Sequence, residues 1–150
     1  MKLFALSAFA CIAFGGAAMA CPDYQQYGST YSYSGDDLWV PQDFGVTAGG
    51  GNSMTACGHG GGEGYFTSAP DFTFDLSRMA GYRLAIRVVS ACDAALLVNT
   101  ANASWYYDDD SNGNLDPAII LSNPGSGYLD VWVGTYDGAY CDATLTLETL

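Results

Sequence analysis

The sequence predicts an all-β protein, an antiparallel β-sandwich closed by two disulfide bonds. Three observations support this prediction. No segment after position 20 shows ten residues of helical periodicity, whereas several runs alternate apolar and polar residues with period two. These runs are separated by Gly, Pro, Asn and Asp, which favour turns. Two sheets packed face to face would bury the apolar side of every strand, and four cysteines would connect them.

Residues 1–20 are typical of an export signal that is cleaved after Ala20. Lys2 supplies the positive start, an apolar run extends from Leu3 to Phe14, and Ala18 and Ala20 are the small residues that a signal peptidase requires. The apolar run is too short to anchor the protein in a bilayer. We therefore expect a periplasmic or extracellular protein whose residues 21–150 form a single domain.

The charge balance excludes several classes of partner. Without Lys2, the chain keeps three arginines against sixteen Asp and Glu residues, a formal charge of −13. Such a surface has no counter-charge for phosphate, so neither nucleic acid nor an anionic membrane is an expected partner. The chain contains one histidine, which excludes metal sites built from several histidines.

The four cysteines that remain after cleavage predict two disulfides in an oxidising compartment. Three pairings are open to four cysteines. Cys92 ends one strand-like run and Cys141 begins the last one, while Cys21 and Cys57 bracket the aromatic N-terminal third. We therefore predict the pairs Cys21–Cys57 and Cys92–Cys141.

The strands are expected where the alternation is clearest, and two stretches resist regular structure. Ala48 to Gly64 holds eight glycines and is expected to be a loop tied down by Cys57. Asp23 to Ser34 is rich in tyrosine and is expected to lie across the sandwich as an irregular strand. The predicted strands cover residues 72–76, 82–88, 96–98, 129–133 and 141–148.

An acidic turn between two apolar runs is the densest chemical feature. Its alternating Asp and Asn with a Gly at the sixth place resemble the start of a calcium loop, although the closing acid is missing because Ile119 stands at the twelfth place. The alternative is a solvated turn whose side chains bond to nearby backbone N–H groups. The candidate calcium ligands are Asp108, Asp109, Asp110, Asn112, Asn114 and Asp116.

A second candidate is a shallow aromatic strip for sugar or peptide. It would be built from Trp132 and tyrosines, with Arg83 and Arg87 as neighbouring polar groups. The alternative is that both arginines pair with acids or stack on an aromatic ring across the sheet.

A catalytic reading rests on His59, which lies in a glycine-rich loop with Glu63 four residues further on. Glu63 could orient His59 as a general base. No activated Ser or Cys accompanies the pair, and the sixteen acids offer many carboxylate pairs without singling one out. A small secreted hydrolase is therefore the alternative function rather than the first.

The second half of the chain resembles the bacterial pre-peptidase C-terminal domain, a secreted jelly-roll-like β-sandwich. The resemblance covers roughly residues 71–149, although Cys92 stands where that family usually has an aromatic residue. The segments that carry it are Gly81 to Ile86, Cys92 to Val98, Tyr107 to Asp110, Asp116-Pro117, and Gly127 to Gly134.

This resemblance implies a non-catalytic accessory or binding module, because such domains accompany secreted peptidases and some bind calcium or matrix polymers. Asp108, Asp109 and Asp110 match the acidic turn of the family. We therefore expect an exported binding module with a protein or polysaccharide partner and calcium as its one candidate cofactor. The alternatives are the hydrolase described above and a structural component of the envelope or matrix.

Overall fold

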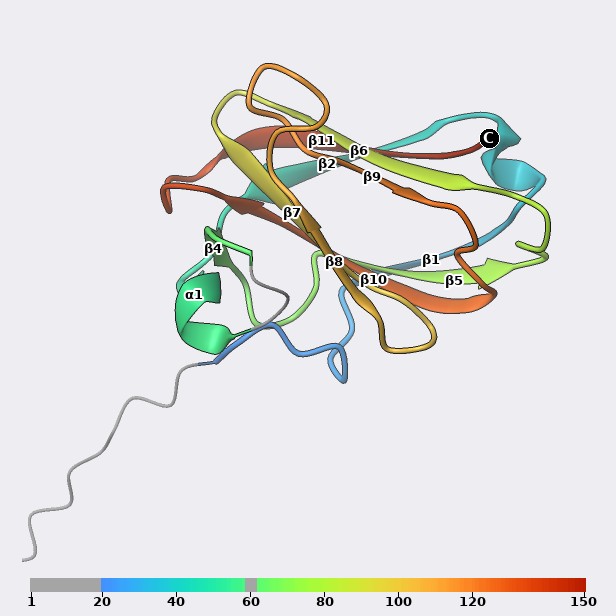
Figure 1. The fold of residues 1–150 in the computed structure, drawn as a ribbon, viewed down its shortest axis with the longest axis horizontal. Helices are drawn as coiled ribbons and strands as arrows, with labels where there is room; N and C mark the ends of the chain where they lie inside the picture. The colour runs from blue at the N-terminus through green and yellow to red at the C-terminus, as the bar shows by residue number, and fades with distance from the viewer. Residues whose placement is uncertain (1–19, 59–61) are drawn as a thin grey trace, which may run out of the picture.

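The computed structural model describes residues 20–58 and 62–150, which form two packed β-sheets (Figure 1). The predicted export signal lies almost wholly outside the described residues, as does His59. In the described part of the chain, no helix is both long and apolar enough to cross a membrane. The all-β sandwich and both disulfides are confirmed.

The smaller sheet has four strands and is antiparallel throughout. Its order is β2 (Gln42–Ala48), β11 (Cys141–Thr149), β6 (Leu84–Ser90) and β9 (Ala118–Leu121). Strand β11 lies at its centre and pairs with β2 over seven residues and with β6 over seven. In Figure 1 this sheet forms the upper layer.

The larger sheet has seven strands centred on β10 (Gly127–Thr135), which pairs with three others. One side of β10 carries β5 (Phe72–Ser77) and then β1 (Ser29–Ser34). The remaining strands of this sheet are β7 (Ala94–Asn99), β8 (Trp105–Asp108), β4 (Tyr65–Phe66) and β3 (Asn52–Ser53).

Strand β1 departs from the antiparallel rule, because it runs parallel to β5. A parallel pair needs a long crossover between its strands. Here the chain leaves β1 through the short 3₁₀ helix η1 (Asp37–Trp39), forms β2 in the other sheet, and returns through β3 and β4 before it enters β5. The predicted irregular strand is thus a regular edge strand over its second half.

The main core lies between the two sheets and is built from the alternate residues that the sequence pattern predicts. Strands β5, β6, β10 and β11 each contribute every second side chain, as expected for strands with one buried face. The fully buried members include Phe74, Leu84, Ile86, Val88, Leu96, Val98, Val131, Val133, Leu145 and Leu147.

A second apolar cluster covers part of the outer face of the larger sheet. Trp132 and Leu97 point away from the main core and pack with Ala95, Met54 and Phe66. Met54 begins α1 (Met54–Cys57), so the stretch that was predicted to be a glycine-rich loop contains a short helix and a short strand. This N-terminal third of the chain therefore covers a face that would otherwise be exposed.

Asp71 is a partly buried carboxylate immediately before β5. Its Oδ2 accepts a hydrogen bond from Val133 N at 2.7 Å. Burial raises the pKa of Asp71 to about 6, against the opposing effect of that hydrogen bond. Because the folded state binds the proton more tightly than the unfolded state, stability falls as pH rises from about 4 to 6.

Replacing Asp71 by Asn is expected to stabilise the protein at neutral pH. The amide oxygen can still accept from Val133 N, and the cost of burying a charge disappears. We expect a gain of at most about 3 kcal/mol above pH 6 and none below pH 4, measured as urea-unfolding free energies from pH 4 to 8. Asp75→Asn, at an exposed position of β5, is the control. A less stable Asp71→Asn protein at pH 7 would contradict the prediction.

Candidate functional site

Asp108 organises the entrance of the predicted acidic turn. Its carboxylate accepts hydrogen bonds from Ser111 N at 3.0 Å, from Ser111 Oγ at 2.6 Å and from Ala118 N at 2.8 Å. These three donors close the turn between β8 and β9. The carboxylate acts here as a bond acceptor for the loop's own backbone, as in the solvated-turn interpretation.

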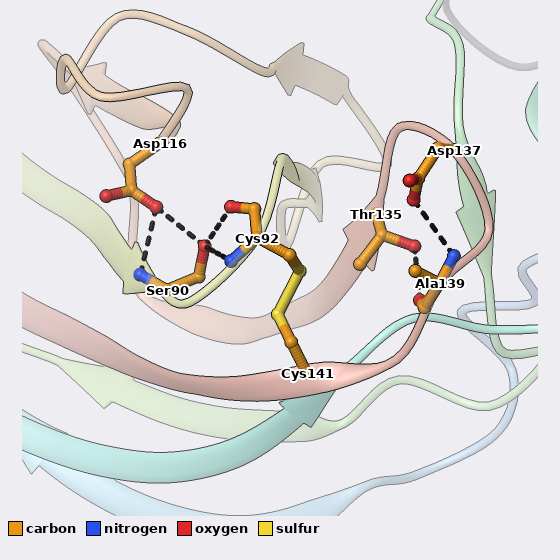
Figure 2. Close-up of a disulfide and its surroundings, with 7 residues drawn as sticks. All are labelled: Ser90, Cys92, Asp116, Thr135, Asp137, Ala139 and Cys141. Atoms are coloured by element: carbon orange, nitrogen blue, oxygen red, sulfur yellow. Dashed lines mark hydrogen bonds between the residues drawn. A yellow bond between two sulfur atoms is a disulfide. The ribbon is translucent and has the colours of Figure 1, made fainter.

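Asp116 and Asn112 attach the same turn to β6. The buried Asp116 accepts at one oxygen, Oδ1, from both Ser90 N at 2.9 Å and Ser90 Oγ at 2.8 Å (Figure 2). Asn112 Nδ2 donates to Val88 O at 2.8 Å. Three of the six predicted ligands therefore hold the loop in place, and the exposed Asn114 takes a left-handed backbone with φ 55°.

Asp109 and Asp110 instead face outward into a small hollow of about 210 Å³. We call this hollow the acidic notch; it is lined by Asp93, Asp109, Asp110, Leu115 and Tyr136. Burial raises the pKa of Asp93, and the nearby charges of Asp110, Asp109 and Asp137 raise it further. The carboxylates of the notch thus repel one another.

Glu63 is linked to the acidic notch through Tyr136. Tyr136 OH donates to Glu63 Oε2 at 2.6 Å, and Tyr107 OH donates to Asp109 Oδ2 at 3.3 Å. The ion pairs found in the described part of the chain are Arg78–Asp36 and Arg87–Glu148, so none of them neutralises the notch. Glu63 is therefore engaged by a tyrosine, while its predicted partner His59 lies outside the described residues.

The described residues contain no group of three or more His, Cys, Asp or Glu placed to hold a metal ion. Calcium in the acidic turn therefore stays a prediction. The acidic residues that line the notch are the half-buried Asp109 and the exposed Asp110, together with the half-buried Asp93 from the loop before β7. The turn's composition predicted the first two, and the fold adds the third.

The predicted aromatic strip does not form. Trp132 is fully buried in the second apolar cluster, and its Nε1 donates to Ser68 O at 3.3 Å, so its indole has no surface for a ligand. Arg83 and Arg87 lie at β6 of the other sheet. Arg87 pairs with Glu148 at 2.6 Å, as the alternative interpretation predicted, and Arg83 is exposed.

A larger hollow at the opposite end of β7 was not predicted. We call it the tyrosine cavity; its volume is about 380 Å³, and its walls include Tyr24, Tyr27 and Tyr128. Asn99 and Asp130, which are opposite each other on β7 and β10, form part of its lining. The many tyrosines of the N-terminal segment were evident in the sequence, but no sequence pattern predicted that this segment lies beside β10.

Comparison with known proteins adds one finding about the fold. No family model and none of the curated proteins match this chain. Among solved structures, the chain is similar to Aeromonas hydrophila PliG, described as a periplasmic lysozyme inhibitor of g-type lysozyme. The two share 12% sequence identity with a TM-score of 0.50, over 83% of this chain and 99% of that one. At this level of sequence identity, the similarity concerns the fold alone.

Proposed function

We propose that this chain is an exported, non-catalytic module that binds and inhibits a cationic enzyme of the lysozyme kind. The acidic notch is the observation that carries the proposal. It gathers Asp93, Asp109 and Asp110 around Tyr136, and no ion pair of the described residues neutralises them. A cationic side chain of a partner would relieve the repulsion among these carboxylates.

Two further features support this function. The net charge of −13 for residues 21–150 attracts cationic proteins over long distances and speeds their encounter. The similar structure, PliG, is an inhibitor and occupies the periplasm, the compartment that the predicted signal and the two disulfides favour. The resemblance to the pre-peptidase C-terminal domain also implies a non-catalytic binding module, although with a different partner.

The test mixes the oxidised protein, residues 21–150, with a g-type lysozyme and follows lysis of peptidoglycan by turbidity. We expect inhibition that saturates at a stoichiometric ratio and weakens as salt rises from 0.05 to 0.5 M, because exposed charges are screened. The protein alone is incubated with the same substrate. Lysis by the protein alone would support the hydrolase alternative, and the absence of both lysis and inhibition would overturn a lysozyme-type partner.

Neutralising the notch is expected to weaken inhibition at least tenfold. The variant is Asp93→Asn with Asp110→Asn, which keeps side-chain volume and removes two charges from the site. Its control is Asp43→Asn with Asp75→Asn, which removes two charges at exposed positions of β2 and β5. Tenfold corresponds to about 1.4 kcal/mol. Equal losses in the two double variants would show that overall charge, and not the notch, is responsible.

Calcium is tested in the same samples by thermal unfolding with calcium and with excess chelator. A cation held by the folded state at 100 times its dissociation constant adds about 2.7 kcal/mol. If calcium occupies the notch, the Asp93→Asn, Asp110→Asn variant loses that gain and calcium competes with the lysozyme. If the midpoint of thermal unfolding does not change with calcium, the notch does not bind calcium, and the partner protein remains its proposed ligand.

A further inference from the structure

The tyrosine cavity contains a buried carboxylate that lacks a counter-charge in the described part of the chain. Asp130 is 5% exposed, and its Oδ1 accepts a hydrogen bond from Thr73 Oγ1 at 2.6 Å. Among the described residues no hydrogen bond to its Oδ2 is found, so this oxygen is open to the solvent of the cavity, and no arginine lines the cavity. Burial accordingly raises the pKa of Asp130, while the hydrogen bond from Thr73 opposes the rise.

The surrounding bonds hold this carboxylate in place rather than neutralise it. Thr73, on β5, lies directly opposite Asp130 and also accepts a hydrogen bond from Gly28 N at 3.1 Å. On the other side of β10, Asn99 would donate to Thr100 O and accept from Trp105 Nε1 once its amide oxygen and nitrogen are exchanged, the orientation that suits these neighbours. Asp130, together with Asn99, therefore forms a polar floor of the cavity.

Aromatic rings form the walls above this floor. The rings of Tyr27 and Tyr128 meet edge to face, with centroids 5.7 Å apart and planes at 78°. Tyr24 stands on a third side and packs edge to face on Trp105 at 6.0 Å. The three tyrosines are 45–64% exposed, so their faces are accessible. All three rings line the same cavity.

We propose that the tyrosine cavity binds an alkylammonium group, with Asp130 as its counter-ion and Tyr24, Tyr27 and Tyr128 as its cation–π walls. A buried carboxylate is costly until a cation pairs with it, and aromatic faces stabilise a cation that has lost its water. The volume of about 380 Å³ lies within the range of small-molecule sites, about 300 to 1,000 Å³.

This site is distinct from the acidic notch. Asp93 precedes β7, whereas Asn99 ends it, so the two residues are separated by roughly 20 Å of extended chain. The ammonium group has two sources, a free small molecule or a lysine side chain of a protein partner. The inference about the cavity does not depend on the lysozyme proposal, because it concerns other residues and another ligand.

The first experiment titrates choline into the oxidised protein at 0.15 M salt and follows tyrosine ring signals by NMR. The matched control is 3,3-dimethyl-1-butanol, which has the shape of choline without its charge. We expect saturable binding of choline, at least tenfold tighter than that of the neutral analogue. The overturning result is a lack of saturation with both choline and a lysine-containing peptide, or equal affinity for choline and its neutral analogue.

Variants then locate the site. Asp130→Asn, which can still accept from Thr73, is expected to weaken binding at least tenfold, and Tyr128→Leu to do the same. Asp43→Asn and Tyr140→Leu change the same residue types elsewhere and are expected to stay within twofold. If Asp130→Asn and Asp43→Asn lowered the affinity for choline equally, the effect would come from the protein's overall charge and not from the cavity. The Tyr128→Leu variant keeps the test decisive if Asp130→Asn does not fold.

The lysine-containing peptide, titrated in parallel, identifies the source of the ammonium group. Binding of choline alone assigns the cavity to a free small molecule. Binding of the peptide in preference to choline assigns it to a lysine side chain of a protein. Either result supports the ammonium site, provided that Asp130→Asn weakens it.

Discussion

Replacing Trp132 by alanine is expected to lower the free energy of unfolding by about 3 to 5 kcal/mol. Trp132 is fully buried, and its ring centroid lies 5.3 Å from that of Trp105. The substitution would leave a cavity between Met54, Phe66 and Leu97 and would remove the donor that bonds to Ser68 O. The second apolar cluster joins β10 to α1 and β4, so the substitution would loosen the packing of these two elements against the sheet.

The measurement is urea unfolding of the oxidised protein at pH 7. Trp39→Ala removes the same side chain from η1, where it is 65% exposed, and is expected to cost far less. Trp132→Phe keeps a ring in the cluster and is expected to fall between the two. If Trp132→Ala cost under 1 kcal/mol, or if it weakened a binding activity while stability was unchanged, Trp132 would have to be regarded as a ligand contact after all.

Removing the Cys92–Cys141 disulfide is expected to cost about 4 kcal/mol. The bond joins residues 49 positions apart, and constraining a loop of this length in the unfolded chain gives about that value. It ties the loop between β6 and β7 to the start of β11 (Figure 2). Cys92 is followed by Asp93 of the acidic notch, so the loop that carries this carboxylate would lose its anchor.

The double substitution Cys92→Ala, Cys141→Ala is compared with Cys21→Ala, Cys57→Ala. Chain entropy makes the two losses similar, since the second bond spans 36 positions. Their functional effects are expected to differ. The first is expected to weaken inhibition through the notch, and the second to weaken choline binding, because Cys21 anchors the segment that carries Tyr24 and Tyr27. Unfolding midpoints unchanged by either removal would contradict the stabilising role.

The strands with strict alternation were predictable because one of their faces is buried. Residues 72–76, 129–133 and 141–148 match β5, β10 and β11 closely, and 82–88 and 96–98 match β6 and β7 within a few residues. Strand β2 was not predicted. Its sequence QDFGVTA contains Gly45 and buries only Phe44 and Ala48, and it pairs with β11 over seven residues. Strands β3, β4, β8 and β9 have four residues or fewer, too few for a period to be recognised.

The acidic turn was recognisable by composition, but its chemistry depended on the rest of the fold. Asp108 and Asp116 were predicted to be ligands together with Asp109 and Asp110, because residue type and spacing do not distinguish them. The structure turns the first two toward backbone and serine donors and leaves the second pair in the notch. Asp93 and Glu63 join that notch from segments distant in sequence, so no local pattern could have included them.

Composition and period-two alternation were enough to predict the strands of strict alternation and the acidic character of the protein, and the cysteine positions favoured the two disulfide pairs. In β10 the alternation also puts Trp132 and Asp130 on the face opposite the main core, which holds Leu129, Val131 and Val133. What covers that face depends on segments that the fold brings together. The N-terminal third buries Trp132 under Met54 and Phe66, yet leaves Asp130 at the floor of an open cavity. Period two fixes which side chains share a face, whereas their burial depends on segments that return from far along the chain.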